Sequence, residues 1–246
     1  MADTKDTPPA YTVSDPSRTI TDDSHQADGN AAPILELSTS AANKTYEIYN
    51  TSTGLNITNS DRQLYYLGRY VALDVPDILA YGGYDQSGPQ LAQAEFIKFD
   101  KNFRIYLGGL RHPSKDDWDM VRCATEGRFI HTDFYRFEVP AQGQSTGTRK
   151  RKLHWTKTSS RKLGASKLSI RDHKLVEEAN GEVLAVYTEH NLGAADGPKG
   201  QLVFHQRLGD NAELAALVVV MAIIEHLRRN MRQIARAFPL QGGGAI

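Results

Sequence analysis

The chain has 246 residues, and its 29 lysines and arginines balance its 29 aspartates and glutamates. This length suits one large domain with a tail, and the neutral total charge removes any whole-chain argument for a nucleic-acid or membrane partner. The single cysteine, Cys123, excludes an intramolecular disulfide and fits a reducing compartment, and no apolar run opens the chain as a secretory signal would. We therefore expect a cytoplasmic protein.

Residues 1–42 are rich in Asp, Ser, Thr, Pro and Ala and contain few large apolar side chains. Such a segment buries too little surface to offset the entropy of ordering, so we predict a disordered tail followed by a domain over 43–240. Pro8, Pro9 and Tyr11 in this tail match the proline-proline-any-tyrosine ligand of WW domains, which dock a preformed polyproline segment. An adaptor that recruits a WW-domain partner is one functional hypothesis, and ordinary tail composition is the alternative.

From residue 44 the sequence becomes a series of short runs rich in β-branched and aromatic residues, separated by Gly, Asp, Asn and Pro. This pattern is typical of strands and turns. The predicted strands are 45–49, 63–72, 95–99, 103–107, 120–123, 129–139, 151–156, 168–172, 174–178, 182–188 and 201–205. Neither face of 129–139 is cleanly apolar, so its orientation stays open.

A hairpin is predicted around Asn180-Gly181, which stands between two alternating runs. These two residues adopt the positive φ angles of a tight turn more readily than others do.

The loop 143–147 matches the glycine-any-serine-any-glycine pattern of a hydrolase nucleophile, with Ser145 as the serine. That chemistry needs a strand, a sharp turn and then a helix, whereas a basic strand-like segment follows here. A serine hydrolase is therefore kept only as a remote alternative.

Basic residues are concentrated between 149 and 174, with Asp172 as the only acid. The candidate lipid-binding residues are Arg149, Lys150, Arg151, Lys152, Lys157, Arg161 and Lys162, and Lys167, Arg171 and Lys174 extend the segment. Each basic residue near an anionic membrane adds about 1 kcal/mol of attraction. Nucleic-acid binding, nuclear import or a merely solvated surface remain alternatives.

The strongest local pattern predicts a helix over 210–238. Asp210 and Glu213 have the spacing of a capping box, and an unbroken apolar run follows over 214–224. Eleven helical residues span about 16 Å, against roughly 30 Å for a bilayer core, so the run is too short for a transmembrane segment. Beyond Glu225 the apolar residues Leu227, Met231, Ile234 and Phe238 share one face opposite arginines, which predicts half burial.

This order of elements resembles the tubby C-terminal-like superfamily, which includes tubby proteins, phospholipid scramblases and LURP-one-related proteins, and a fungal branch of it most closely. The resemblance is carried by Leu153-His154-Trp155, the runs 175–178, 183–187 and 200–204, and then the helix with its trailing arginines. It covers 150–245 well and 44–150 only in texture.

The resemblance implies a closed antiparallel β-barrel of about twelve strands around a buried C-terminal helix. It also implies a non-enzymatic module that binds phosphoinositides or other anionic phospholipids, peripheral to membranes. Tubby ligand positions do not transfer residue by residue, and the single Cys123 departs from the cysteine-rich segment of scramblases. The scattered histidines have no zinc-like spacing, so neither a metal site nor a cofactor is predicted.

Overall fold

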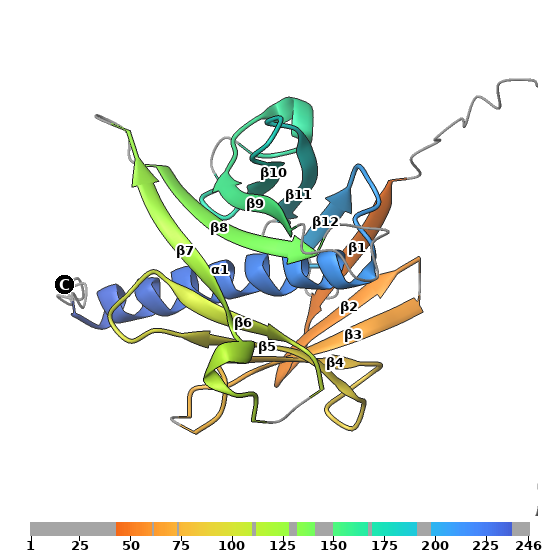
Figure 1. Ribbon diagram of the computed structural model, residues 1–246, viewed down its shortest axis with the longest axis vertical. Coiled ribbons are helices and arrows are strands. Elements are labelled where there is room, and N and C mark those ends of the chain that lie inside the picture. Colours follow the sequence, from red (N-terminus) through yellow and green to blue (C-terminus); the bar gives the residue numbers. More distant parts are fainter. Residues whose placement is uncertain are drawn as a thin grey trace, which may run out of the picture. The chain divides into compact units, whose positions relative to one another are not determined.

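The computed structural model describes residues 43–60, 62–72, 74–109, 112–127, 132–140, 150–166, 169–190 and 198–237. These residues form twelve antiparallel strands closed into a barrel, with one long helix in its interior (Figure 1). The strands are β1 (Lys44–Asn50), β2 (Gly54–Asn59), β3 (Arg62–Arg69), β4 (Ile78–Gly82), β5 (Gln90–Phe96), β6 (Phe103–Leu107), β7 (Asp119–Glu126), β8 (Thr132–Pro140), β9 (Lys150–Lys157), β10 (His173–Glu177), β11 (Val183–Glu189) and β12 (Gly200–Phe204). The helix α1 spans Asp210–Ala237, and short 3-10 turns occupy Lys115–Asp117 (η1) and Arg161–Leu163 (η2).

Each strand pairs with its neighbours in the chain, and β1 closes the sheet by pairing with β12. The register of this closing pair runs from Lys44 opposite Phe204 to Ile48 opposite Gly200. Closure leaves no strand without a partner, so the barrel has no exposed sheet edge. The predicted closed barrel with a buried helix is confirmed.

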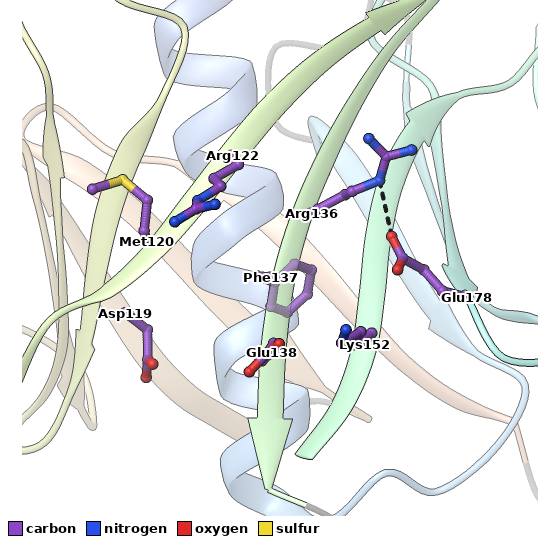
Figure 2. A pocket seen from close by; sticks show the side chains of 8 residues that line it. All are labelled: Asp119, Met120, Arg122, Arg136, Phe137, Glu138, Lys152 and Glu178. Atoms are coloured by element: carbon purple, nitrogen blue, oxygen red, sulfur yellow. Dashed lines mark hydrogen bonds and ion pairs between the residues drawn. The ribbon is translucent and has the colours of Figure 1, made fainter.

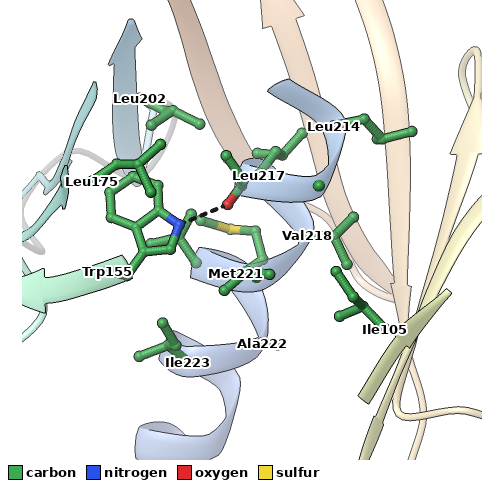
Figure 3. Close-up of a cluster of buried hydrophobic side chains, with 14 of the residues drawn as sticks. Ile105, Trp155, Leu175, Leu202, Leu214, Leu217, Val218, Met221, Ala222 and Ile223 are labelled. Carbon is green, nitrogen blue, oxygen red and sulfur yellow. Dashed lines mark hydrogen bonds between the residues drawn. The ribbon is translucent and has the colours of Figure 1, made fainter. Parts of the chain in front are cut away.

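Helix α1 fills the barrel because its first half is apolar on every side. All residues from Ala212 to Ile223 are buried. Figure 3 shows Leu217, Val218 and Met221 packed between Trp155 and Leu175 on one side and Ile105 on the other. The indole Nε1 of Trp155 donates to the carbonyl oxygen of Ala216 at 3.1 Å, which satisfies the one polar atom of the largest core side chain.

Two features of α1 differ from the sequence prediction. Asp210 is the first helical residue and its side chain is 95% exposed, whereas Glu213 turns inward. The Glu213 carboxylate accepts hydrogen bonds from Lys44 at 2.6 Å, Tyr46 at 3.0 Å and the Leu208 N–H at 3.3 Å. The predicted capping box is therefore replaced by contacts with the barrel wall.

The second difference lies at the other end of α1. Residues 224–229 are mostly half-buried, but every residue from Asn230 to Ala237 is exposed. Met231 and Ile234 are 50% and 59% exposed. The predicted half burial holds at Leu227 and is wrong at Met231 and Ile234, because the helix outruns the barrel there, and Phe238 lies outside the described residues.

Ten of the eleven predicted strands overlap an observed strand, but the predicted strand 95–99 shares only Glu95 and Phe96 with β5, and its residues 97–99 belong to the β5–β6 connection. One predicted strand does not form, and two observed strands were not predicted. β2 and β4 were not predicted, since asparagines and glycines interrupt β2 and β4 has only five residues. The predicted strand 168–172 does not form over its described residues, because the Asp172 carboxylate accepts from the Ser166 N–H, the Ser169 hydroxyl and the Glu189 N–H and so holds a compact loop. In β8, Tyr135, Phe137 and Val139 face the core, which settles the open orientation.

The predicted hairpin joins β10 to β11, but its loop is longer than a two-residue turn. Gly181 donates to the Glu177 carbonyl at 2.9 Å and Glu177 donates to the Glu182 carbonyl at 3.0 Å. Only Gly181 has a positive φ, +72°, so Asn180 does not contribute the second one.

Candidate functional site

The order of the strands places alternate connections at opposite ends of the barrel. The end at which the C-terminal part of α1 emerges is here called the exit rim, and strands β1, β3, β5, β7, β9 and β11 end there (Figure 1). Two ion pairs fix this assignment, because Arg69 at the end of β3 lies 4.0 Å from Glu225 and Lys44 at the start of β1 lies 2.6 Å from Glu213. The end beside Glu213 is called the opposite rim.

A buried carboxylate organises the helix where it leaves the barrel. Glu225 is 3% exposed and accepts two hydrogen bonds of 2.8 Å from Arg228 and one of 2.9 Å from Arg229. Burial alone would raise the pKa of Glu225, but the hydrogen bonds from the two arginines outweigh burial and hold it below its ordinary value. With Arg69 beside them, three guanidinium groups share one carboxylate.

Arg229 also joins the helix to two strand connections. Its guanidinium pairs with the Asp77 carboxylate, donates to the Tyr70 carbonyl at 2.5 Å and lies 4.9 Å from the centre of the Phe96 ring. Asp77 in turn accepts from the Phe96 N–H at 2.7 Å. These contacts, here called the Arg229 clamp, hold the bases of the β3–β4 and β5–β6 connections against α1.

His226 lies beside the clamp, 5.2 Å from the Phe96 ring. Burial lowers the pKa of His226, and the charge of Arg229 lowers it further. The imidazole is therefore held in its neutral form, which avoids adding another positive charge to the arginines.

A cavity of about 370 Å³, here called the mouth pocket, opens at the exit rim between α1 and strands β1, β3 and β11. Its floor is apolar and includes Leu55, Leu67, Ile78, Met221 and Ile224. Its walls carry four cationic side chains, Arg69, Arg171, Lys199 and Arg228, against two carboxylates, Glu189 and Glu225. The pocket thus combines an apolar floor with an excess of positive charge.

The positive charge of the mouth pocket is incompletely compensated. Burial lowers the pKa of Arg69, the nearby charge of Arg228 lowers it further, and Glu225 only partly opposes these effects. Arginine stays protonated under such shifts, so the lowered pKa reports first the burial of the Arg69 guanidinium and second its repulsion by Arg228. An anion placed between Arg69 and Arg228 would relieve that repulsion.

The predicted basic segment is divided between the two ends of the barrel. Lys150 lies near the opposite rim and pairs with Asp119 at 3.2 Å and Glu138 at 3.9 Å, and Arg151 pairs with Glu177 at 2.8 Å. Lys152 lies on the same end of β9. Acidic neighbours therefore offset much of the charge at this end.

The remaining predicted residues lie at the exit rim. Lys157 ends β9, and Arg161 and Lys162 form η2 in the β9–β10 connection. These three, with Lys98, Arg232 and Arg236, are exposed basic side chains, and they outnumber the exposed carboxylates Asp74, Asp100 and Glu126 described at this rim. The structure does not bring the predicted segment together as one patch.

A second cavity, a shallow groove of about 430 Å³ on the outer wall of the barrel, differs from the mouth pocket in the balance of its charges (Figure 2). Its charged lining consists of Arg122, Arg136 and Lys152 with Asp119, Glu138 and Glu178. Arg136 is engaged by Glu178 at 2.9 Å and Glu126 at 2.7 Å. Its charged lining holds three cations and three carboxylates, whereas the mouth pocket holds four cations and two carboxylates, so this groove is a weaker candidate for an anion than the mouth pocket.

Some sequence predictions fall on residues that the structure does not describe. Arg149, Ser145 and the motif Pro8, Pro9 and Tyr11 lie outside the described residues. Among the described residues, no cluster of His, Cys, Asp and Glu has the geometry of a metal site. No helix in the described part of the chain is long and apolar enough to span a bilayer.

Sequence reasoning missed three of the four cations of the mouth pocket as site residues. Arg69, Lys199 and Arg228 lie on β3, before β12 and on α1, far apart in the chain. Arg171 belongs to the basic segment but was not singled out. Only closure of the barrel brings these residues together. No protein-family model, no curated protein and no solved structure matches the chain.

Proposed function

We propose that this protein is a non-enzymatic binding module for anionic phospholipids at membrane surfaces, with the lipid headgroup held in the mouth pocket. The observation that carries the proposal is the excess of cationic side chains above an apolar floor in one cavity of about 370 Å³. This volume lies in the range of small-molecule sites, which are mostly apolar with a few polar groups that fix orientation.

The chemistry of the pocket suits a phosphate attached to an apolar body. A guanidinium group donates two parallel hydrogen bonds to phosphate oxygens, and the wall of the pocket carries three such groups, on Arg69, Arg171 and Arg228. Arg171 also pairs with Glu189 at 2.6 Å and Arg228 with Glu225 at 2.8 Å, so a phosphate would share these two arginines with the carboxylates. The glycerol and the first carbons of the acyl chains would cover Leu55 and Ile224, which keep some exposed surface on the floor. A nucleic acid or a free inorganic anion would leave that apolar surface without a partner.

The tubby-like resemblance favours phosphoinositides among anionic lipids, and it stays a prediction. Exposed Lys157, Arg161 and Lys162 lie at the same rim as the mouth pocket and would add long-range attraction. Lys150 and Lys152 lie at the other end and are not required.

To test the proposal, the full chain is titrated with a soluble short-chain phosphoinositide, and binding is measured by calorimetry. Short-chain phosphatidylcholine serves as the neutral control lipid. Replacing Arg69 and Arg171 together by glutamine should weaken phosphoinositide binding at least about tenfold, since each lost charged hydrogen bond is worth about 1.5–3 kcal/mol. Phosphatidylcholine should bind weakly to both proteins.

The matched control replaces Lys150 and Lys152 by glutamine, which removes the same charge from the opposite rim. This variant should bind as the wild type does. Equal losses in both variants, or no phosphoinositide binding by the wild type, would reject the mouth pocket as the site. Thermal melting of each variant checks that the fold is kept.

The WW-adaptor hypothesis rests on Pro8, Pro9 and Tyr11, and the hydrolase alternative rests on Ser145. Both motifs lie outside the described residues. They stay predictions and are independent of the mouth pocket.

A further inference from the structure

The exposed large apolar side chains of the described residues are concentrated at the exit rim. Val71 and Val75 lie in the β3–β4 connection, Phe99 in β5–β6, Ile170 in β9–β10, and Met231 and Ile234 on the emerging helix, whereas only Tyr84 and Met120 lie elsewhere. Val71 and Phe99 are 87% and 98% exposed. Exposed apolar side chains that gather at one end of a protein are one sign of an interaction surface.

Phe99 is held outward by a rigid and strained loop. Its φ of +62° lies in the left-handed region, which is unfavourable for a bulky side chain. The loop is fixed by the Asp100 N–H bonded to the Ile97 carbonyl at 3.1 Å and by two bonds between Asp100 and Asn102. The Phe99 ring is 98% exposed and therefore lies outside the core of the barrel.

The segments that carry the exposed apolar side chains are held together by the Arg229 clamp. The Arg229 clamp joins the bases of the connections that carry Val71 and Phe99 to the helix that carries Ile234. Basic groups accompany these apolar side chains, because Lys98 Nζ lies 5.2 Å from the Phe99 ring centre and Arg232 and Arg236 lie on the exposed turns of α1.

We infer that the exit rim docks on an anionic membrane, with Phe99, Val71 and Ile234 entering the boundary between headgroups and acyl chains. Apolar groups at this depth combined with cations at the phosphate level are the general means by which a protein lies on a membrane surface. The mouth pocket opens at the same rim, so a headgroup bound there would belong to the same membrane. This inference rests on the proposed function in its choice of a lipid partner.

The experiment compares binding to vesicles with binding to a soluble lipid. Full-length protein is sedimented with vesicles of phosphatidylcholine containing phosphatidylserine and phosphoinositide, and is titrated separately with short-chain phosphoinositide. The variant combines Phe99→Gly with Ile234→Gln. Glycine removes the strain at residue 99 and both positions are exposed, so the variant should melt at or above the wild-type temperature.

Vesicle affinity of this variant should fall at least about tenfold, because two large apolar side chains would no longer leave water on binding. Its affinity for the soluble lipid should be unchanged. The matched control is Tyr84→Gly, which removes an aromatic ring that is 73% exposed in the β4–β5 connection at the opposite rim. This control should bind vesicles as the wild type does.

Vesicle binding by the Phe99 and Ile234 variant that equals the wild type would overturn the inference, and so would an equal loss in the Tyr84 control. The proposed function is judged separately. If the Arg69 and Arg171 variant loses the soluble lipid while the rim variant keeps its vesicle affinity, the pocket stands and the docking surface fails. Rim-dependent vesicle binding without any soluble-lipid binding supports the docking surface and rejects the pocket.

Discussion

Glu225 is a single buried carboxylate on which the charge balance of the exit rim depends. Its pKa is lower in the folded protein than the ordinary value of 4.5, so its ionised form stabilises the fold at neutral pH. That contribution is complete above pH 4.5 and is lost as the pH falls through the lower folded value. Acid should therefore weaken this junction between helix and barrel.

The change Glu225→Gln tests this role. At pH 7 it should lower the free energy of unfolding by about 3 kcal/mol, because Arg69, Arg228 and Arg229 lose the charge that compensates them. Denaturant unfolding measured across pH should show the gap between variant and wild type narrowing below pH 4.5. A gap that is the same at every pH would contradict the proposed ionisation.

Buried histidines add a second pH dependence of the free energy of unfolding, which the wild type and the Glu225→Gln variant share. Burial lowers the pKa of His154, His173 and His226 below the ordinary 6.5. The unfolded chain therefore binds protons first, and stability should begin to fall below pH 6.5 in wild type and variant alike. The difference between the two proteins isolates Glu225.

At the scale of elements, α1 is the core of the barrel along its first half and a surface element along its last two turns. Val219 is fully buried within the first half. Val219→Asp should abolish folding, since it places an unpaired carboxyl group among apolar strands. Val219→Ala should stay folded and lose about 2 kcal/mol. A soluble Val219→Asp protein with normal melting would contradict the central position of the helix.

The exposed turns of the same helix should respond differently. Arg232 lies beyond the barrel, so Arg232→Ala should change the free energy of unfolding by no more than about 0.5 kcal/mol. The comparison with Val219 thus separates the buried half of α1 from its exposed end.

At the scale of the whole molecule, closure depends on β1, which pairs with both β12 and β2. A chain that lacks residues 1–42 keeps β1 and should melt as the full chain does. A chain that lacks residues 1–50 leaves β2 and β12 as open edges and should aggregate. Melting curves and size-exclusion chromatography of the two truncations check this, and a cooperative monomer from the shorter chain would contradict it.

More of the fold than of the candidate site could be predicted from the sequence. Local alternation in runs such as Phe103–Leu107 and the all-round apolar start of α1 are properties of neighbouring residues, so they can be recognised in the sequence. Glu213 was misplaced because its partners Lys44 and Tyr46 come from the other end of the domain. The mouth pocket has the same difficulty, since Arg69 and Arg228 meet only after twelve strands have closed.

The core of this barrel is the last element to be synthesised. Strands β1 to β12 leave the ribosome before α1, although the fully buried first half of α1 is part of the core on which their inward faces pack. Domains generally fold as units during synthesis, at about 5–20 residues per second. The growing chain must therefore keep a nearly complete set of unfilled strands from associating with other chains until the helix arrives. We therefore expect this chain to be most prone to aggregation during translation, before α1 is complete, and to need chaperones at that stage.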